Sequence, residues 1–243
     1  MYIDLENRSI WIGGTKMKRI KVSNNVIRRL PRYLRKLDEL NEQGVSRISS
    51  GELGKQLGLT PSQIRQDFSC FGDFGQQGYG YNVNTLRQDI ATILGMDRGF
   101  NAILLGVGNI GNALLQNFSF EEWGFSMKAA FDIKPELIGT EVNGVPVLSQ
   151  EQLSDYLQQN KVDVVVLCVP KEIAVKMTSD LIEQGIDAFW NFTNVELTDP
   201  NSDVLVENMH FSDSLLALSY FVADKADEEI ARQNRQKRLN NRT

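Results

Sequence analysis

Apolar residues in the first third of the chain recur at helical spacing. Between Ser23 and Leu40 the apolar positions stand three or four residues apart, which places them on one stripe of a helix. Pro31 interrupts this stripe, and it either kinks one long helix or sits in the first turn of a second helix. The residues of the stripe are Val26, Leu30, Leu34, Leu37 and Leu40.

Two short helices with matching start signals follow. Ser49 and Glu52 fit a capping box, and Gly58 provides the C-terminal stop. Thr60 repeats the cap, with Pro61 at the first helical position. A turn of few residues that contains a glycine joins the two helices, and this layout predicts a helix-turn-helix.

Glycines and aromatic residues are interspersed between Phe71 and Tyr81. Glycine permits tight turns and aromatic residues favour strands, so we interpret this segment as a β-hairpin wing. The next window, from Asn84 to Gly95, has helical spacing. It predicts a helix that links this domain to the next.

Beyond Gly99, short apolar runs alternate with helical windows, a pattern typical of a doubly wound parallel sheet. The sequence therefore predicts an α/β chain, with a winged helix-turn-helix domain followed by a Rossmann domain. The predicted strands cover residues 102–106, 127–133, 145–148, 162–169, 188–192 and 204–206, and the predicted helices cover residues 110–118, 151–160 and 172–184.

The first of these strands ends in a glycine-rich turn. Gly106, Gly108 and Gly111 form the pattern G-x-G-x-x-G, in which glycines permit the turn, the approach of a pyrophosphate and close helix packing. Asp132 ends the next strand, where a carboxylate binds ribose hydroxyls and repels a 2′-phosphate. These residues predict a site for NADH and NAD⁺ rather than NADP(H), and a purely structural glycine turn is the alternative.

Two further segments follow predicted strands at their carboxyl ends, where ligands bind in open α/β sheets. They are Val169-Pro170 and the run from Phe189 to Thr193, which contains Asn191. Either these segments line the nicotinamide half of the site or they pack at the edge of the sheet.

Residues suited to catalysis are scarce. A dehydrogenase needs a proton donor or acceptor beside the nicotinamide. His210 is the only histidine, and it begins the last helical window. No separate substrate domain is evident after the dinucleotide fold, so we expect binding without turnover and no enzyme activity.

Composition limits the class of protein. The chain has 243 residues, enough for two domains, with no long apolar run and no signal peptide, so we expect a cytoplasmic protein. Cys70 and Cys168 lack a partner motif, which argues against a disulfide framework or a zinc site. We interpret both as packing residues, and a redox-sensing thiol is the alternative.

The net charge of −5 conceals an asymmetry. Residues 1–80 hold 13 Lys and Arg against 8 Asp and Glu, and the segment from Lys16 to Lys36 has nine basic residues and no acidic one. Such a segment attracts phosphates, although a solvated basic face is the alternative. In the second capped helix Ile64 and Phe68 face the core, which turns outward polar side chains of the types that bind bases and phosphates.

The last helical window, from Phe211 to Asn240, begins apolar and ends basic. Its apolar part is too rich for a free surface helix, so it buries either on its own domain or on a second subunit. Two-fold dimers are the commonest oligomers, and a dimer presents two recognition helices to palindromic operator DNA.

From about Ile20 to Ala223 the chain resembles the Rex family of redox-sensing transcriptional repressors. The motifs that carry this resemblance are RLPRY (29–33), ISS (48–50), QIRQDFS (63–69), FG (71–72), GYGY (78–81), GVGNIG (106–111) and FDI (131–133). The resemblance implies a homodimer with exchanged C-terminal helices, in which NADH favours a closed form that leaves the operator and NAD⁺ competes for the site. It also implies repression of fermentation or respiration genes whose products regenerate NAD⁺.

Candidate site residues fall into two sets. The nucleotide-binding set is Gly106, Val107, Gly108, Asn109, Ile110, Gly111, Asp132, Ile133, Val169, Pro170, Asn191 and Phe211. The DNA-binding set is Arg29, Arg32, Arg47, Ser62, Gln63, Arg65, Gln66, Ser69, Gln76, Gln77 and Tyr79.

Two positions depart from the pattern of the family. Gln76 and Gln77 stand where many relatives have basic residues in the wing, so phosphate attraction there is expected to be weaker. His210 stands where an Asp is frequent at the start of the exchanged helix. The ion pair assigned to that Asp in the family is therefore not assumed here.

The predicted domains are an N-terminal extension (1–15), a winged-helix domain (16–83), a linker helix (84–98), a Rossmann domain (99–208) and a C-terminal dimerisation helix with a basic tail (209–243). Two rival functions are an NAD-dependent oxidoreductase and a CoA-binding protein, each with an appended DNA-binding domain. CoA-binding folds share the glycine-rich turn and similar Val-Pro and Asn-Phe-Thr segments, and Asp132 argues against them.

Overall fold

The structure is a computed structural model that describes residues 2–4, 9–12, 15–16, 22–72, 74–75, 79–197 and 204–240. The chain divides into two compact units, Met1–Asp97 and Arg98–Thr243. Near the N-terminus, β1 (Tyr2–Asp4), β2 (Ser9–Ile12) and β3 (Thr15–Lys16) form a small antiparallel sheet. Three basic residues of the predicted phosphate-attracting segment, Lys18, Arg19 and Lys21, lie outside the described residues.

Four helices form the core of the first unit. The stripe predicted on the first of them is buried, and Pro31 lies inside this single continuous helix, so no second helix starts there. The helices are α1 (Asn24–Glu42), α2 (Ser50–Leu57), α3 (Pro61–Ser69) and α4 (Val83–Ile93).

The caps of α2 and α3 confirm the predicted helix-turn-helix. The Ser49 hydroxyl accepts a hydrogen bond from the Glu52 N–H at 3.1 Å, and the Thr60 hydroxyl accepts one from the Gln63 N–H at 3.2 Å. Gly58 ends α2 in the left-handed conformation, with φ of 69°. The caps and the glycine stop fix where the two helices end and begin, so only a short turn separates them.

The segment between α3 and α4 includes the predicted wing. Asp73 and residues 76–78 lie outside the described residues, so the hairpin stays a prediction. After this segment, β5 (Tyr81–Asn82) pairs antiparallel with β4 (Arg47–Ile48), which precedes α2. The end of the predicted wing is thus tied to the start of the helix-turn-helix.

Helix α4 differs from its predicted role as a linker. Val83, Leu86 and Ile90 are at most 1% exposed, and they pack with the side chains of α1 in one core. The unit that contains α4 extends to Asp97. The three residues share one helical face, so periodicity predicted the helix, while the domain that buries this face was not readable from the sequence.

The second unit is built on a seven-stranded sheet, which confirms the predicted doubly wound α/β fold. Its order is β12-β11-β10-β6-β7-β9-β8, and neighbours run parallel except for the β8–β9 hairpin. The six predicted strands are present, and the two-residue β8 was not predicted. The strands are β6 (Phe100–Leu105), β7 (Phe125–Asp132), β8 (Glu141–Val142), β9 (Val145–Ser149), β10 (Val164–Leu167), β11 (Ala188–Asn191) and β12 (Leu205–Asn208).

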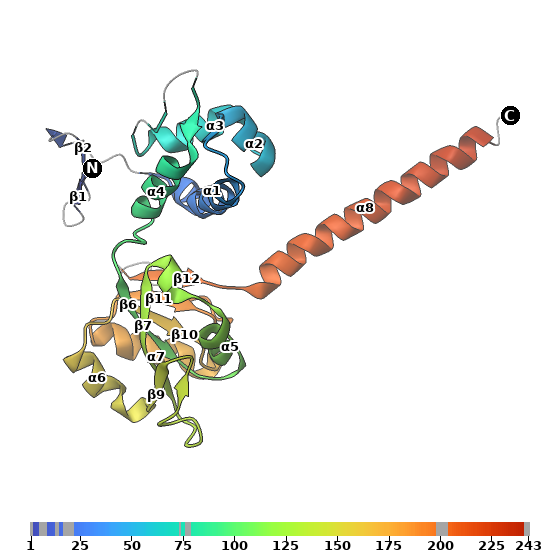
Figure 1. Ribbon diagram of the computed structural model, residues 1–243. Helices are drawn as coiled ribbons and strands as arrows, with labels where there is room; N and C mark the ends of the chain where they lie inside the picture. The colour runs from blue at the N-terminus through green and yellow to red at the C-terminus, as the bar shows by residue number, and fades with distance from the viewer. Residues whose placement is uncertain are drawn as a thin grey trace. The chain divides into compact units, whose positions relative to one another are not determined.

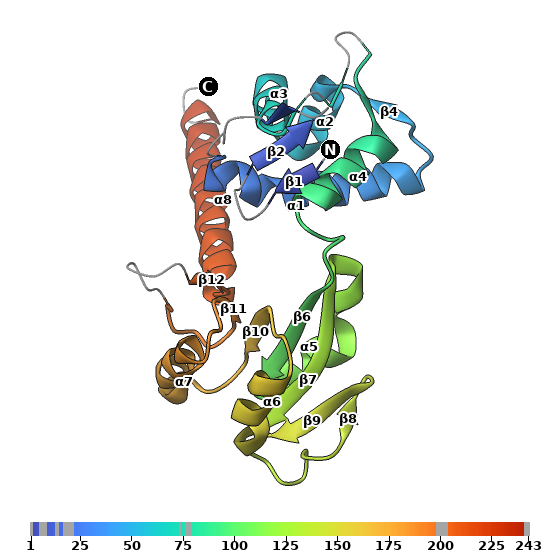
Figure 2. The same cartoon turned by 90° about the vertical axis from the view of Figure 1, so that its left-hand side faces the viewer.

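Helices cover both faces of this sheet (Figures 1 and 2). Side chains alternate along β6, so Ala102 and Leu104 join one core while Ile103 and Leu105 join the other. The first core packs against α5 and the second against α6 and α7. These helices are α5 (Asn109–Asn117), α6 (Leu153–Gln159) and α7 (Lys171–Glu183).

The C-terminal window forms one helix, α8 (Phe211–Asn240), as predicted (Figure 1). Its large apolar side chains are 56–66% exposed, so they are not buried on their own domain. Among the described residues, no helix combines the length and apolar character that crossing a bilayer requires. The exposed residues are Phe211, Leu215, Leu216, Leu218, Tyr220, Phe221, Val222 and Ile230.

Candidate DNA-binding and dinucleotide-binding sites

Helix α3 has a buried inner face and a polar outer face. Ile64 and Phe68 are at most 2% exposed, and Asp67 lies between them at 1%. The Phe68 ring packs edge-on against Tyr33, with ring centres 5.0 Å apart. Of the predicted DNA-binding residues on α3, Gln63 is half-buried and the others, Ser62, Arg65, Gln66 and Ser69, are exposed.

Hydrogen bonds order part of this outer face. Arg65 donates to the Ser50 hydroxyl on α2 at 2.9 Å, and Ser69 donates to the Gln66 carbonyl at 2.8 Å. The Ser62 and Thr60 hydroxyl oxygens lie 3.1 Å apart. The outer face therefore presents polar side chains from fixed positions, the arrangement that base and phosphate recognition requires.

Like Arg65, the other three arginines predicted to bind DNA are hydrogen-bonded to the protein itself. Arg32 donates to the Leu57 carbonyl at the end of α2 at 3.1 Å, and Arg47 donates to the Tyr79 carbonyl at 3.2 Å. Arg29 makes two hydrogen bonds to Asp67, which are described next. The Tyr79 side chain is 70% exposed, whereas Gln76 and Gln77 lie outside the described residues.

A buried carboxylate joins α1 to α3. Asp67 accepts hydrogen bonds from Arg29 Nε and Nη2, at 2.6 and 2.7 Å, and from the Tyr33 hydroxyl at 2.6 Å. The hydrogen bond to Asp67 raises the pKa of the Arg29 guanidinium. Burial, and then the hydrogen bond to Asp67, raise the pKa of the Tyr33 hydroxyl well above its usual value. Sequence reasoning missed this cluster, although Asp67 occupies a position where the helical period predicts an apolar residue.

The three glycines of the dinucleotide turn differ in what a side chain at each position would meet. Gly106 has φ of +91°, and a Cβ there would lie 2.7 Å from the Cys168 carbonyl oxygen. A Cβ on Gly111 would lie 2.0 Å from the Gly106 carbonyl oxygen. A Cβ on Gly108 would meet nothing within 4 Å, and no side chain caps the α5 N-terminus that Gly108 begins. Gly106 and Gly111 are thus required by packing, while Gly108 leaves open space in front of the first backbone N–H groups of α5, including those of Asn109 and Ile110.

Asp132 is 6% exposed and holds the turn from the neighbouring strand. It accepts a hydrogen bond from the Val107 N–H at 2.7 Å and another from the Lys134 N–H at 2.9 Å. A carboxylate has about four acceptor sites, so two are left for the ribose hydroxyls that the sequence predicts there. Beside it, the Ile133 side chain is 71% exposed.

The segments with two open interpretations differ from one another. Asn191 is 1% exposed; its amide donates to the Val195 carbonyl and to Asn208, and its oxygen accepts from Thr193. Its position in this network favours the packing interpretation. Val169 is buried, while Pro170 is exposed at the start of α7.

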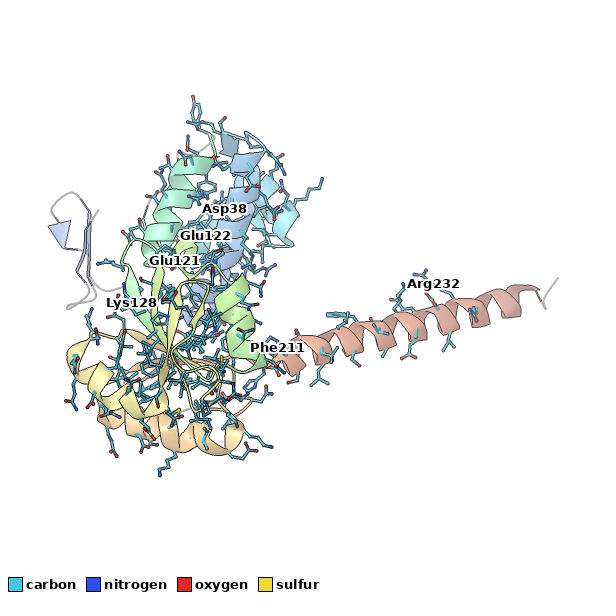
Figure 3. The ribbon with its side chains drawn as sticks, turned by 60° about the horizontal axis from the view of Figure 1, so that its bottom comes forward. Asp38, Glu121, Glu122, Lys128, Phe211 and Arg232 are labelled. Carbon is cyan, nitrogen blue, oxygen red and sulfur yellow. The ribbon has the colours of Figure 1, made fainter. Side chains whose placement is uncertain are left out.

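Phe211, which Figure 3 labels, is the first residue of α8, and His210 directly precedes it. The Phe211 ring is 58% exposed and its centre lies 6.3 Å from that of Phe192. His210 Nε2 lies 2.8 Å from a carboxylate oxygen of Glu196. Sequence reasoning missed this histidine–glutamate pair, since the two residues come from different segments.

Neither cysteine has the environment of a reactive thiol. Burial raises the pKa of the Cys168 thiol to about 12, which leaves almost no thiolate at neutral pH. Cys70 is half-buried, and its thiol donates to the Gln66 carbonyl at 3.4 Å. The packing interpretation is therefore favoured for both. In the described part of the chain, no cluster of three or more metal-ligating side chains is present.

Models of two protein families match the chain. The model described as "Putative DNA-binding protein N-terminus" matches residues 21–69, which include the helix-turn-helix. The model described as "CoA binding domain" matches residues 97–195, which include the glycine-rich turn.

Curated proteins are similar over most of the chain. A protein of Thermoanaerobacter pseudethanolicus named "Redox-sensing transcriptional repressor Rex" is 49% identical over 203 residues, which cover 84% of this chain and 90% of that protein. A Clostridium acetobutylicum protein of the same name is 47% identical over 202 residues, which cover 83% of this chain and 94% of that protein.

Solved structures of a Rex-family repressor, RSP, are also similar. The complex of RSP with β-NAD⁺ and operator DNA has a TM-score of 0.79 and 46% identity, and covers 86% of this chain and 96% of that one. The complex of RSP with β-NADH has a TM-score of 0.79 and 43% identity, and covers 86% of this chain and 98% of that one.

Proposed function

The chain belongs to the Rex family of redox-sensing transcriptional repressors, and we propose that it is a homodimer in which NADH and operator DNA each weaken binding of the other. It is a regulator of transcription and not an enzyme, as its curated relatives are repressors. We propose that the protein acts in the cytoplasm and represses genes whose products regenerate NAD⁺.

The observation that carries this proposal is the presence of two different binding geometries in one chain. The first unit presents a capped helix-turn-helix whose second helix has a polar outer face. The second unit presents a glycine-rich turn with open space at Gly108 and a carboxylate at the end of the next strand. A protein that bound only DNA would not need the second geometry, and a dehydrogenase would not need the first.

The residues of the turn fit a dinucleotide. The N–H groups at the start of α5 and its positive dipole end would bind the pyrophosphate, which approaches over Gly108. Asp132 would accept hydrogen bonds from the ribose hydroxyls with its remaining lone pairs, and its charge would exclude a 2′-phosphate. The bound nucleotide supplies the redox signal through the oxidation state of its nicotinamide ring.

The exposed apolar face of α8 supports the homodimer. Monomeric proteins seldom expose a large contiguous apolar surface, and large apolar side chains on the first half of α8 are 57–66% exposed. Burial against a second subunit would remove this surface from water. In the dimer that we propose, the two subunits exchange α8, and the dimer has one recognition helix for each half-site of a palindromic operator.

Coupling between the two sites follows from thermodynamic linkage. If NADH binds the closed dimer better than the DNA-binding form, DNA must weaken NADH binding by the same factor. A complete switch, from 99:1 to 1:99, needs a difference of about 10⁴-fold in affinity between the two forms. We expect a partial shift of one to two decades, because coupling free energies are usually about 1–3 kcal/mol.

The test starts from a duplex that the wild-type protein selects out of a random-sequence DNA pool. Its affinity is then measured at one fixed salt concentration while NADH or NAD⁺ is added, since salt alone changes DNA affinity strongly. We expect NADH to weaken binding at least about ten-fold and NAD⁺ to reverse this effect. An affinity that neither nucleotide changes contradicts the proposed sensing.

CoA binding is the second candidate function, because the matching family model for residues 97–195 is a CoA binding domain. Trp190 packs between Phe118 and Phe192 in the second unit, so its fluorescence provides a probe. Quenching by NADH but not by CoA supports the dinucleotide, and the opposite result supports the CoA alternative.

A further inference from the structure

Asp67 is an acidic residue in the helix that faces DNA in the proposed function, on which this inference rests. A carboxylate on the outer face would repel phosphates, but Asp67 lies on the inner face at 1% exposure. An effect of Asp67 on DNA binding therefore acts through the position of α3.

Three directed hydrogen bonds fix this carboxylate. Two come from one edge of the Arg29 guanidinium, at 2.6 and 2.7 Å, and the third comes from the Tyr33 hydroxyl at 2.6 Å. Arg29 and Tyr33 are four residues apart and so share one face of α1. Together the two donors fix the orientation of α3 relative to α1 and the position along α1 at which the two helices meet.

The apolar contacts of α3 define this geometry less strictly. Ile64 and Phe68 bury one narrow stripe of a nine-residue helix, and the hydrophobic effect that favours their burial is not directional. The edge-on contacts of Phe68 with Tyr33, Phe74 and Tyr81 orient only this one ring. Side-chain atoms lie about 5–6 Å from a helix axis, so a rotation of about 20° moves them about 2 Å. Such a shift is larger than the spread of about 0.5 Å in hydrogen-bond lengths, and base contacts would be lost.

We infer that Asp67 is a positioning residue for operator recognition, which holds the outer face of α3 in register by its bonds to Arg29 and Tyr33. The predicted role of Arg29 changes accordingly. Its side chain is 21% exposed and two of its nitrogen atoms bind Asp67, so it acts mainly as the partner of this carboxylate. Desolvation of both charges offsets much of the attraction in a buried ion pair, so net stability alone does not explain the Asp67–Arg29 pair.

The same unit contains a matched control. Asp38 pairs with Arg87 and joins α1 to α4, away from the recognition helix (Figure 3 labels Asp38). Asp38→Asn removes the same charge from the same domain as Asp67→Asn, and Arg87→Gln matches Arg29→Gln. Each comparison therefore cancels the general effect of charge on DNA attraction.

The experiment measures the affinity of each full-length variant for the selected duplex and for a scrambled duplex of equal composition, over a series of salt concentrations. We expect Asp67→Asn to bind the selected duplex at least about ten-fold more weakly than Asp38→Asn, with equal affinity for the scrambled duplex. Arg29→Gln should show the same selective loss as Asp67→Asn, with the salt slope of Arg87→Gln. NADH affinity, which belongs to the second unit, should not change.

Several results overturn the inference. One is an Asp67→Asn protein that binds the selected duplex as Asp38→Asn does, and another is an equal loss on both duplexes. If Arg29→Gln lowers the salt slope by about 0.9 relative to Arg87→Gln, Arg29 contacts a phosphate directly and the role assigned to it is wrong.

A folding defect does not prevent the test. Circular dichroism reports whether Asp67→Asn is folded, and if it is not, Tyr33→Phe decides, because it removes one hydrogen bond of the three. We expect a selective loss of about three-fold for this variant, and unchanged operator affinity overturns the inference. If the wild-type protein selects no duplex at all, the proposed function fails rather than this inference.

Discussion

Each unit of the protein contains one buried aspartate at its candidate site, and different partners hold the two carboxylates. Side chains of Arg29 and Tyr33, more than 30 positions away in sequence, hold Asp67. Backbone N–H groups of Val107 and Lys134 hold Asp132. We call the hydrogen bonds to Asp67 the side-chain clamp and the hydrogen bonds to Asp132 the backbone clamp. The side-chain clamp can be lost by substitution of Asp67, Arg29 or Tyr33. The backbone clamp survives substitution of Val107 or Lys134, but it depends on the path of the glycine-rich turn.

A change in the path of the glycine-rich turn should give the largest loss of stability. Gly111→Ala places a Cβ 2.0 Å from the Gly106 carbonyl oxygen, so the turn that carries Val107 must move. We expect the second unit to lose about 4 kcal/mol of its free energy of unfolding, measured by denaturant titration. Gly108→Ala is the matched control, because its Cβ meets no atom within 4 Å. Equal stability of the two variants would contradict the packing argument.

Removal of the side-chain clamp should come next. Asp67→Ala leaves the Tyr33 hydroxyl and part of the Arg29 guanidinium buried without their acceptor. We expect the first unit to lose about 3 kcal/mol of its free energy of unfolding. Asp132→Ala should cost about 2 kcal/mol in the second unit, because it leaves two backbone N–H groups without this acceptor. A larger loss of stability for Asp132→Ala than for Asp67→Ala would contradict the difference that we infer between the two clamps.

The open space at Gly108 separates ligand binding from folding. Gly108→Val fills the approach to the α5 N-terminus, and we expect NADH to bind about 100-fold more weakly, a loss of about 2.7 kcal/mol. Operator affinity should persist and should no longer respond to NADH. Fluorescence titration and DNA-binding assays measure the two properties, and loss of both together would indicate misfolding instead.

Alkaline pH should give the smallest effect. The pKa of Tyr33 is raised in the folded protein, while an unfolded tyrosine titrates near about 10. Its contribution to stability is complete below that pH and is lost as the pH rises, because the unfolded state deprotonates first. We expect the first unit to lose about 1 kcal/mol between about pH 10 and 11, and Tyr33→Phe should lack this component. Parallel pH curves for the two proteins would exclude the assignment to Tyr33.

Local and periodic signals predicted most of the fold. The parallel strands of the second unit were predicted from short apolar runs, while the two-residue antiparallel β8 was not predicted. The α2 and α3 caps were predicted because Ser49 and Thr60 act on groups three residues away. The burial of α4 was not predicted, since an apolar face does not identify the surface that covers it.

The site was predicted less completely, because its clamps join distant segments. The glycine pattern indicated the turn, but the bond from Val107 to Asp132 spans 25 positions and has no local signal. For Asp67 a signal existed: a carboxylate three residues after Ile64 falls on the apolar stripe of α3, which indicates a buried partner. The partner itself, Arg29, was interpreted as a DNA contact because basic residues near a helix-turn-helix usually bind phosphates.

The measurement that tests the central claim most directly is the affinity of NADH for the full-length protein, with and without a saturating amount of the selected duplex. The account predicts that the duplex weakens NADH binding by the same factor by which NADH weakens duplex binding, about ten-fold or more. An NADH affinity that is the same in both samples would show that the two sites are independent, and the account would be wrong.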